Sequence, residues 1–244
     1  MKHQIALYLF FLLLMACGRD KALHFETTSL DREGTTEVKL TLPEAKGNTR
    51  IARAINAALR EEVISLLNFE DSLEVVNLEQ AVASFCKGYE NLSSLYPDET
   101  PGWKAEIFAE VTYEDAHWIS IMINAYIFTG GAHGYGSVRF LNFDKQKGTE
   151  LRPWELFRNE GDFRRFAESR FRRQEQIPEN QAINSTGFMF EENLFSLPEN
   201  IGLTEEGIKL HYNQYEVASY ADGPIELTLP FPEVKQFLKI PGKS

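Results

Sequence analysis

The residues best suited to chemistry lie in the string TGGAHGYG at positions 129–136, where four glycines surround His133. A glycine-rich loop cradles phosphate when it leads from a strand into a helix, and the nucleotide-binding version adds Gly-Lys-Ser or Gly-Lys-Thr. This string has no such ending, and the segments on both sides of it have the pattern of strands. We therefore predict a wide or bulged hairpin connection in which His133 bonds to a neighbouring carbonyl, with a functional role for His133 as the alternative.

Tyrosines form a second candidate group. Tyr135 lies within the glycine-rich string, and Tyr212, Tyr215 and Tyr220 fall in an aromatic-rich connection near the C-terminus. Tyrosines near a sheet edge stack on sugars or anchor a protein partner, but more often they pack with the hydroxyl bonded to backbone. The sequence favours packing. If the chain binds a ligand, we expect His133, Tyr135, Tyr215 and Tyr220 to contact it.

Signatures of catalysis are incomplete. Asp222-Gly223-Pro224 is similar to the Asp-Asp-Gly-Pro signature of metal-dependent polysaccharide deacetylases, but the preceding residue is Ala221. A catalytic zinc requires three protein ligands, and the spacing of His117, His133 and His211 supplies no His-x-x-x-His pair. Neither Gly-x-Ser-x-Gly nor His-Glu-x-x-His occurs, while a carboxylate pair for glycoside hydrolysis stays open. We expect no catalysis, no metal and no cofactor, and we interpret Asp222-Gly223-Pro224 as a turn.

Two other features have ordinary structural interpretations. Cys86 lies in a helical pattern, and we expect a small buried hydrophobe rather than a reactive thiol. Five arginines in the helix expected at 162–176 resemble an anion-binding patch, but Glu168 stands four residues from both Arg164 and Arg172. This spacing predicts a solvated helix face with ion pairs.

The N-terminus has the features of a lipoprotein signal. Lys2 and His3 precede a charge-free run that ends in Leu14-Met15-Ala16-Cys17. The run is too short to span a bilayer, and its charged start and apolar centre are typical of a secretory signal. Its end resembles a lipobox, in which the cysteine is acylated. We expect a signal peptide at 1–16, a short tether at 17–23 and a lipid on Cys17 that anchors the protein to a bacterial membrane in the cell envelope. An ordinary secretory peptide is the alternative.

The overall charge limits the choice of partner. The formal net charge is −11, which argues against nucleic acid and anionic lipid head groups as ligands and favours a basic partner. With a lipid on Cys17, Cys86 would be the remaining one of two cysteines, so we expect no intrachain disulfide.

The chain alternates between helical and strand patterns. Residues 103–113 and 119–127 have period two over long stretches, which indicates antiparallel sheet. Residues 49–67 repeat apolar groups at helical spacing, and Asn77 followed by Gln80 indicates the start of a second helix. The other expected elements are strands at 24–30, 35–42, 138–143, 195–203, 208–212 and 225–229, a helical turn at 152–157, a helix at 162–176 and a final helix from 232. Clustered strands and helices predict an α+β fold, a largely antiparallel sheet packed with two to four helices, in one domain at 24–244 with sub-parts 24–128 and 129–244.

Two strings together carry a family resemblance. TGGAHG followed by LNFD and LRPWELF, and later LTEEGIKLHYNQYEVASYADGPIELTLPFPEV, resemble the extracytoplasmic domain shared by the anti-sigma factor RsiV and the non-catalytic N-terminal part of the deacetylase PdaC. Family members commonly have Ala-Pro-Tyr where this chain has Ala218-Ser219-Tyr220. The resemblance implies a binding or sensing module outside the cytoplasm, present in many lipoproteins. In RsiV this domain recognises lysozyme, a basic protein.

Our main hypothesis is a lipid-anchored, non-catalytic module that binds or senses an envelope ligand. The ligand would be a cell-wall glycan or a protein such as lysozyme. The alternatives are a peptidoglycan-modifying hydrolase or deacetylase, and a structural or assembly lipoprotein that works through protein contacts alone.

Overall fold

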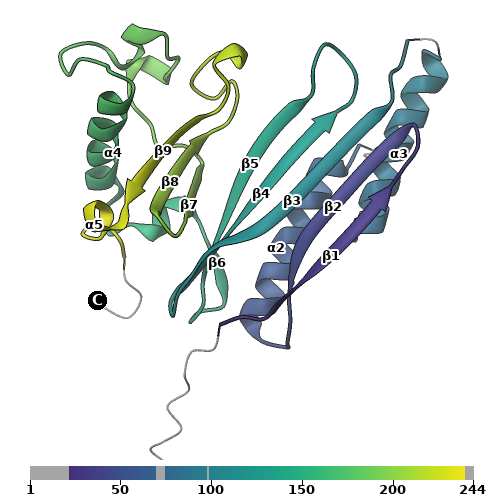
Figure 1. Cartoon of the computed structure of the whole chain (residues 1–244), viewed down its shortest axis with the longest axis horizontal. Coiled ribbons are helices and arrows are strands. Elements are labelled where there is room, and N and C mark those ends of the chain that lie inside the picture. The colour runs from purple at the N-terminus through teal and green to yellow at the C-terminus, as the bar shows by residue number, and fades with distance from the viewer. Residues whose placement is uncertain (1–21, 70–74, 98, 240–244) are drawn as a thin grey trace, which may run out of the picture.

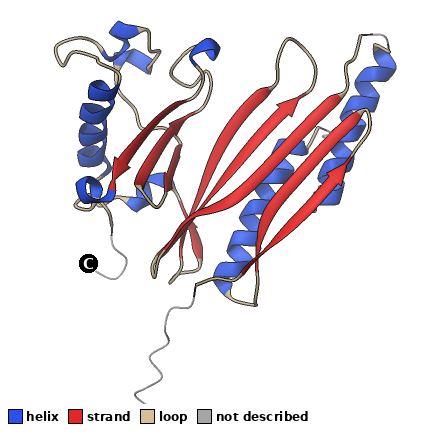
Figure 2. Ribbon diagram, in the orientation of Figure 1, coloured by secondary structure: helices blue, strands red, loops and turns tan. Residues whose placement is uncertain are grey.

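The computed structural model describes residues 22–69, 75–97 and 99–239 and has two sheets, each with its own helices (Figure 1 and Figure 2). A six-stranded sheet carries α2 and α3, and a three-stranded antiparallel sheet carries α4 and α5. This arrangement is the predicted α+β class. The expected signal peptide, Cys17 and most of the expected tether lie outside the described residues.

The strands are β1 (Phe25–Arg32), β2 (Thr36–Ala45), β3 (Trp103–Glu114), β4 (Trp118–Phe128), β5 (Tyr135–Asp144), β6 (Thr149–Leu151), β7 (Asn200–Leu203), β8 (Gly207–Tyr212) and β9 (Ile225–Pro230). The α-helices are α2 (Arg50–Leu67), α3 (Leu78–Leu95), α4 (Glu160–Gln174) and α5 (Phe231–Val234). The 3-10 turns are η1 (Pro153–Leu156), η2 (Ile183–Thr186), η3 (Glu191–Asn193) and η4 (Tyr220–Asp222).

The first two helices form because their apolar spacing and their caps agree. Thr49 Oγ1 accepts a hydrogen bond from Ala52 N at the start of α2 (3.2 Å), and Asn77 Oδ1 accepts one from Gln80 N at the start of α3 (2.9 Å). The predicted role of Gln80 differs in detail, because its side chain accepts from Val76 N, one residue before the cap. The predicted stripe of α2 is buried in full: Ile51, Ile55, Leu59, Val63 and Leu67.

The connection through α2 and α3 explains the parallel pair in the six-stranded sheet. The strand order is β1-β2-β3-β4-β5-β6, and among these described strands β2 and β3 run parallel while the other neighbours run antiparallel. An antiparallel pair closes with a short turn, whereas a parallel pair needs a long crossover, here the two helices. Both helices cover the face that buries Val38, Ile107 and Ile123, which leaves the opposite face open to the second sheet.

Several strands differ from the prediction, most clearly β7, β5 and β6. β7 begins at Asn200 rather than Phe195, because Pro198 has no N–H for a ladder and Phe195 is buried among aromatic rings of the second half. β5 begins at Tyr135 rather than Val138, so the hairpin with β4 is longer than expected. β6 was not expected, since three residues are too few to show a period.

Each sheet and its helices form one half of the structure, and each half has its own hydrophobic cluster. The first lies between β2–β5 and the helices α2 and α3, and the second lies between β7–β9, α4, α5 and η1. Phe143 in β5 belongs to the first cluster and Leu151 in β6 to the second. In the second cluster Phe171 of α4 contacts four other aromatic rings, namely Phe188, Phe190, Phe195 and Tyr212.

The two halves are joined where β7 meets the open face of the six-stranded sheet. Asn142 Nδ2 donates to Ile201 O (2.7 Å), Leu203 N donates to Ser120 Oγ (3.1 Å), and Thr112 Oγ1 donates to Leu203 O (2.8 Å). Ser120 Oγ also donates to Asn142 Oδ1 (2.7 Å), and these two side chains are 0% and 1% exposed. β7 is an edge strand, and edge strands present unpaired backbone groups. Side chains of β3, β4 and β5 therefore take the place of a neighbouring strand.

Close packing supports the same junction. Gly202 of β7 lies on the ring of Phe140 in β5, and an added Cβ would overlap that ring. Glycine is needed here because the backbone approaches an aromatic side chain closely.

We predict that Asn142→Ala will destabilise the chain by about 2–3 kcal/mol, because it leaves the buried Ile201 carbonyl and Ser120 hydroxyl without their partner. Urea-induced unfolding followed by circular dichroism measures this change. Asn124→Ala is the matched control, since Asn124 is half-buried on the same sheet face and stands outside the network; its effect should stay within about 0.5 kcal/mol. Equal effects of the two substitutions would contradict this account of the junction.

Candidate functional site

The string TGGAHGYG joins β4 to β5, as predicted. Gly130 (φ 105°) and Gly131 (φ 89°) have left-handed backbone that favours glycine. Gly134 is needed for another reason, because an added Cβ would meet the ring of Tyr126 at 2.5 Å. These glycines therefore serve the turn and the packing of a tyrosine beneath it.

His133 is held by its own loop and by the distant β8–β9 connection. Its ring stacks on Tyr220, with 3.9 Å between ring centroids and 20° between planes. Its Nδ1 lies 3.1 Å from Gly134 O, and the Tyr220 hydroxyl donates to the same carbonyl at 3.3 Å. The predicted bond to a neighbouring carbonyl is confirmed. The stack with Tyr220 fills the space beside the loop with the chain's own side chains.

Tyr215 extends this stack toward solvent. Its ring centroid is 5.4 Å from that of Tyr220, and the residue is 57% exposed. Its φ is +69°, a left-handed conformation that is costly for a tyrosine. Tyr135 is 43% exposed at the first position of β5, at the same end of the sheet. The structure thus brings His133, Tyr215 and Tyr220 into contact and places Tyr135 nearby, and we call these four residues the aromatic end.

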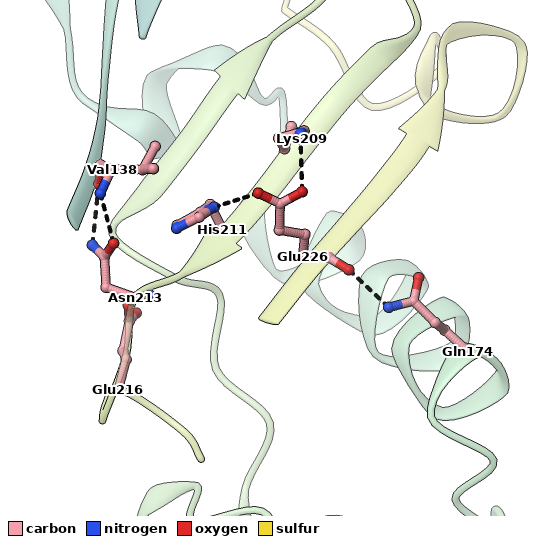
Figure 3. A network of polar contacts seen from close by, with 7 residues as sticks. All are labelled: Val138, Gln174, Lys209, His211, Asn213, Glu216 and Glu226. Atoms are coloured by element: carbon pink, nitrogen blue, oxygen red, sulfur yellow. Dashed lines mark hydrogen bonds and ion pairs between the residues drawn. The ribbon is translucent and has the colours of Figure 1, made fainter. Parts of the chain in front are cut away.

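An asparagine positions the connection that carries Tyr215 and Tyr220 (Figure 3). Asn213 Oδ1 accepts from Val138 N (2.8 Å) and Asn213 Nδ2 donates to Val138 O (3.1 Å), so one amide bonds both backbone groups of a β5 residue. Glu216 Oε2 accepts from Asn213 N (2.8 Å), which closes the turn around Tyr215. The aromatic end is therefore clamped to β5 directly beside the glycine-rich hairpin.

An exposed aromatic pair on the open sheet face was not predicted from the sequence. Phe108 and Tyr126 are 45% and 40% exposed, and with Lys39, Glu106 and Asn124 they line a shallow hollow of about 390 Å³. The sequence did contain a signal for this pair. Side chains alternate between the two faces of β3 and β4, so the positions that place isoleucines in the core place Phe108 and Tyr126 on the opposite face. Tyr126 also supports Gly134, so this pair adjoins the aromatic end.

Tyr212 follows the predicted packing role. It is fully buried, and its hydroxyl donates to Ser196 O at 2.6 Å. Asp222-Gly223-Pro224 forms a turn, as interpreted: the Ser219 hydroxyl donates to Asp222 Oδ2 (2.6 Å), and Gly223 has φ +73°.

Buried His211 pairs with the exposed Glu226 on the three-stranded sheet (Figure 3). His211 Nδ1 lies 2.9 Å from Glu226 Oε1, and Lys209 Nζ donates to Glu226 Oε2 at 3.0 Å. Burial lowers the pKa of His211 against the opposing effect of Glu226. Burial raises the pKa of Glu226, but the bonds from Lys209 and His211 outweigh it and hold that pKa below its usual value. With 2% of its surface exposed, His211 orients Glu226 and β9 rather than meeting a ligand.

The remaining sequence candidates have structural roles. Cys86 is 5% exposed, and burial raises the pKa of its thiol, which disfavours the reactive thiolate. The arginines of α4 are partly neutralised as predicted, with Arg165 paired to Asp162, Arg172 to Glu168 and Arg170 to Glu233.

Within residues 22–69, 75–97 and 99–239, no three His, Cys, Asp or Glu side chains are grouped to hold a metal ion. No helix in that part of the chain is long and apolar enough to cross a bilayer.

Comparison with known families accounts for both halves. Residues 31–135 match the family model described as deacetylase PdaC, and residues 155–232 match the model of a protein family of unknown function, DUF3298. The chain is a PdaC/DUF3298-like protein. The first match ends within the glycine-rich string, and the second begins in η1 and includes Tyr215 and Tyr220.

Solved structures of DUF3298 family proteins share the fold of this PdaC/DUF3298-like chain. A protein from Bacteroides fragilis superposes with a TM-score of 0.68 at 18% identity, covering 90% of this chain and 94% of that one. A protein from Pseudomonas aeruginosa PAO1 superposes with a TM-score of 0.62 at 19% identity, covering 90% of this chain and 96% of that one. The search of curated proteins gives no match.

We predict that the PdaC/DUF3298-like chain loses stability as the pH falls from about 7.5 to 5.5, through the ordinary pKa of histidine near 6.5. The folded state holds the pKa of His211 below that value, so the unfolded state binds more protons in this window. Chemical unfolding at several pH values measures the slope. His211→Gln should flatten the slope, and His24→Gln, at an exposed histidine, should leave it unchanged. A slope that His211→Gln does not alter would assign the effect to other groups.

Proposed function

We propose that this chain is a non-catalytic, extracytoplasmic binding module for a cell-wall glycan, with the aromatic end as the contact surface. The observation that carries the proposal is Tyr215, an exposed ring held in left-handed backbone at the end of the stack His133–Tyr220–Tyr215. Backbone strain of this kind costs on the order of 1–3 kcal/mol and clusters where a side chain must be presented to a ligand. Rigid tyrosines offer an apolar face for a sugar ring and a hydroxyl for its polar edge.

The path of the chain supports a membrane-tethered arrangement. Leu23 N donates to Glu114 Oε1 (2.9 Å) where β3 turns into β4, at the opposite end of β4 from the glycine-rich hairpin (Figure 1). β4 has 11 residues, which at a typical rise of 3.4 Å per residue corresponds to about 35 Å. Six residues from Cys17 to Leu23 reach at most about 20 Å. A lipid on Cys17 would therefore keep the Leu23 end near the bilayer and turn the aromatic end outward, toward the wall.

A basic protein such as lysozyme is the second candidate ligand. The net charge of −11 favours it, and exposed tyrosines are common anchors in protein interfaces. The hydrolase alternative receives less support. His133 Nδ1 faces the backbone carbonyl of Gly134, whereas a catalytic histidine would pair with a carboxylate or a nucleophile. The assembly alternative would use the same exposed aromatics for protein contacts.

We predict that Tyr215→Gly will weaken binding of amidase-released peptidoglycan glycan strands at least about tenfold, as for loss of an aromatic anchor. The melting temperature should stay the same or rise, because glycine relieves the left-handed backbone. Isothermal titration calorimetry and thermal unfolding measure the two effects.

Leu194→Ala is the control, since it removes a 65% exposed hydrophobe from another surface and should change neither affinity nor melting temperature. Unchanged affinity in Tyr215→Gly would refute the role of the aromatic end. Saturable binding of lysozyme that weakens with salt, in place of glycan binding, would favour the second candidate. Turnover of peptidoglycan fragments that is abolished by His133→Ala would favour a hydrolase.

A further inference from the structure

A separate cavity lies between the two halves, on the side of β5 that borders β6. Its volume is about 350 Å³, at the lower end of the roughly 300–1,000 Å³ of small-molecule sites. Its polar and aromatic lining comes from Arg139, Glu150, Arg152, Trp154, Glu160 and Glu199, so both halves contribute. We call it the Trp154 cavity. It shares no lining residue with the aromatic end.

Trp154 offers a rigid apolar wall to this cavity. The residue is 51% exposed, whereas Trp103 and Trp118 are 5% and 6% exposed. It lies in η1, where Pro153 fixes the first position and Glu155 Oε2 accepts from Arg152 N at 2.9 Å. The Arg152 guanidinium lies 5.4 Å from the centroid of the Trp154 ring. The ring is thus held in place before any ligand arrives.

The charged lining offers hydrogen bonds that the chain itself does not use. The Arg139 side chain is 38% exposed, and its carboxylate contact, Glu62 Oε2, lies 3.9 Å from Nε. Nε itself is buried, so a ligand in the cavity would meet the terminal nitrogens of the guanidinium. Burial raises the pKa of Glu150, although Arg139 opposes this shift. Arg139 can therefore donate to a ligand oxygen, and Glu150 can accept from a ligand hydroxyl or, when protonated, donate to one.

We propose that the Trp154 cavity binds one or two rings of a neutral saccharide. Three glutamates and two arginines in the lining nearly balance each other, so a net charge of either sign on a ligand gains little. A neutral polyhydroxylated ligand can use both kinds of group, because its hydroxyls donate to the carboxylates and accept from the guanidinium groups. The apolar face of the sugar would pack on Trp154. This site does not depend on the aromatic end.

Trp154 itself reports on the proposal, because its exposed indole responds to a ligand while the two buried tryptophans do not meet one. The mature chain is titrated with N,N′-diacetylchitobiose, N,N′,N″-triacetylchitotriose and maltotriose, following tryptophan fluorescence and calorimetry. The expected result is saturable binding of at least one saccharide at one site per chain. Trp154→Ala and Arg139→Lys should each weaken it at least tenfold. Arg139→Lys keeps the charge and removes the planar guanidinium with its fixed pair of terminal donors.

Leu194→Ala is the control and should leave this binding unchanged, because it removes an exposed side chain that belongs neither to the Trp154 cavity nor to the aromatic end. Binding that Tyr215→Gly weakens and Trp154→Ala does not would assign the saccharide to the aromatic end and overturn the proposal. Circular dichroism checks that each variant is folded. Trp154→Phe keeps an aromatic face, so its affinity for the saccharide should lie between those of the wild type and Trp154→Ala. Absence of saturation with all three saccharides at millimolar concentration would overturn the proposal. Undiminished affinity in Trp154→Ala, or binding of glucose 6-phosphate in preference to the neutral sugars, would also overturn it.

Discussion

The structure depends on side chains that hydrogen-bond the unpaired backbone groups at the edges of two strands. β7 has β8 on one side, and on the other side Thr112, Ser120 and Asn142 bond its backbone from the six-stranded sheet. β5 extends beyond the end of β6, and there Asn213 bonds both backbone groups of Val138. An amide carries a donor and an acceptor side by side, so it can replace the missing strand for one residue. Because each half supplies caps for the other, the two sheets are fixed in orientation and not merely in contact.

This reciprocal capping positions both candidate sites. Asn213 draws the β8–β9 connection onto β5, and as a result Tyr220 reaches the carbonyl of Gly134 and the ring of His133. On the other side of β5, the docking of β7 sets the segment that ends at Glu199 against η1, and the Trp154 cavity lies between them. A surface of exposed rings and an open cavity thus result from one junction.

Local patterns predicted the elements but not this junction. Period-two alternation located β3 and β4, and apolar spacing with an N-cap located α2 and α3, because these signals are contained in neighbouring residues. Nothing in the residues next to Asn142 and Asn213 distinguishes an asparagine that bonds the backbone of a distant strand from one whose amide is exposed to solvent. The same limit explains the overlong strand expected at 195–203, where Phe195 serves an aromatic core assembled from distant helices and turns. For the candidate site, the sequence predicted the turn role of the glycines and the carbonyl contact of His133. It could not predict the stack on Tyr220, which lies far along the chain.

The distribution of perturbed titrating groups favours binding over catalysis as the proposal for the aromatic end. Catalytic groups are expected to combine a shifted pKa with access to substrate. Here burial raises the pKa of Tyr113 to about 12, raises the pKa of Tyr212 and lowers the pKa of His211, yet Tyr212 and His211 are at most 2% exposed. Burial also raises the pKa of Glu216, beside Tyr215, and the Glu216 carboxylate already accepts a hydrogen bond from Asn213 N in its own turn. Tyr215, by contrast, is exposed and strained. A surface whose histidine Nδ1 already faces a backbone carbonyl, and whose exposed feature is an aromatic face, is suited to hold a ligand without transforming it.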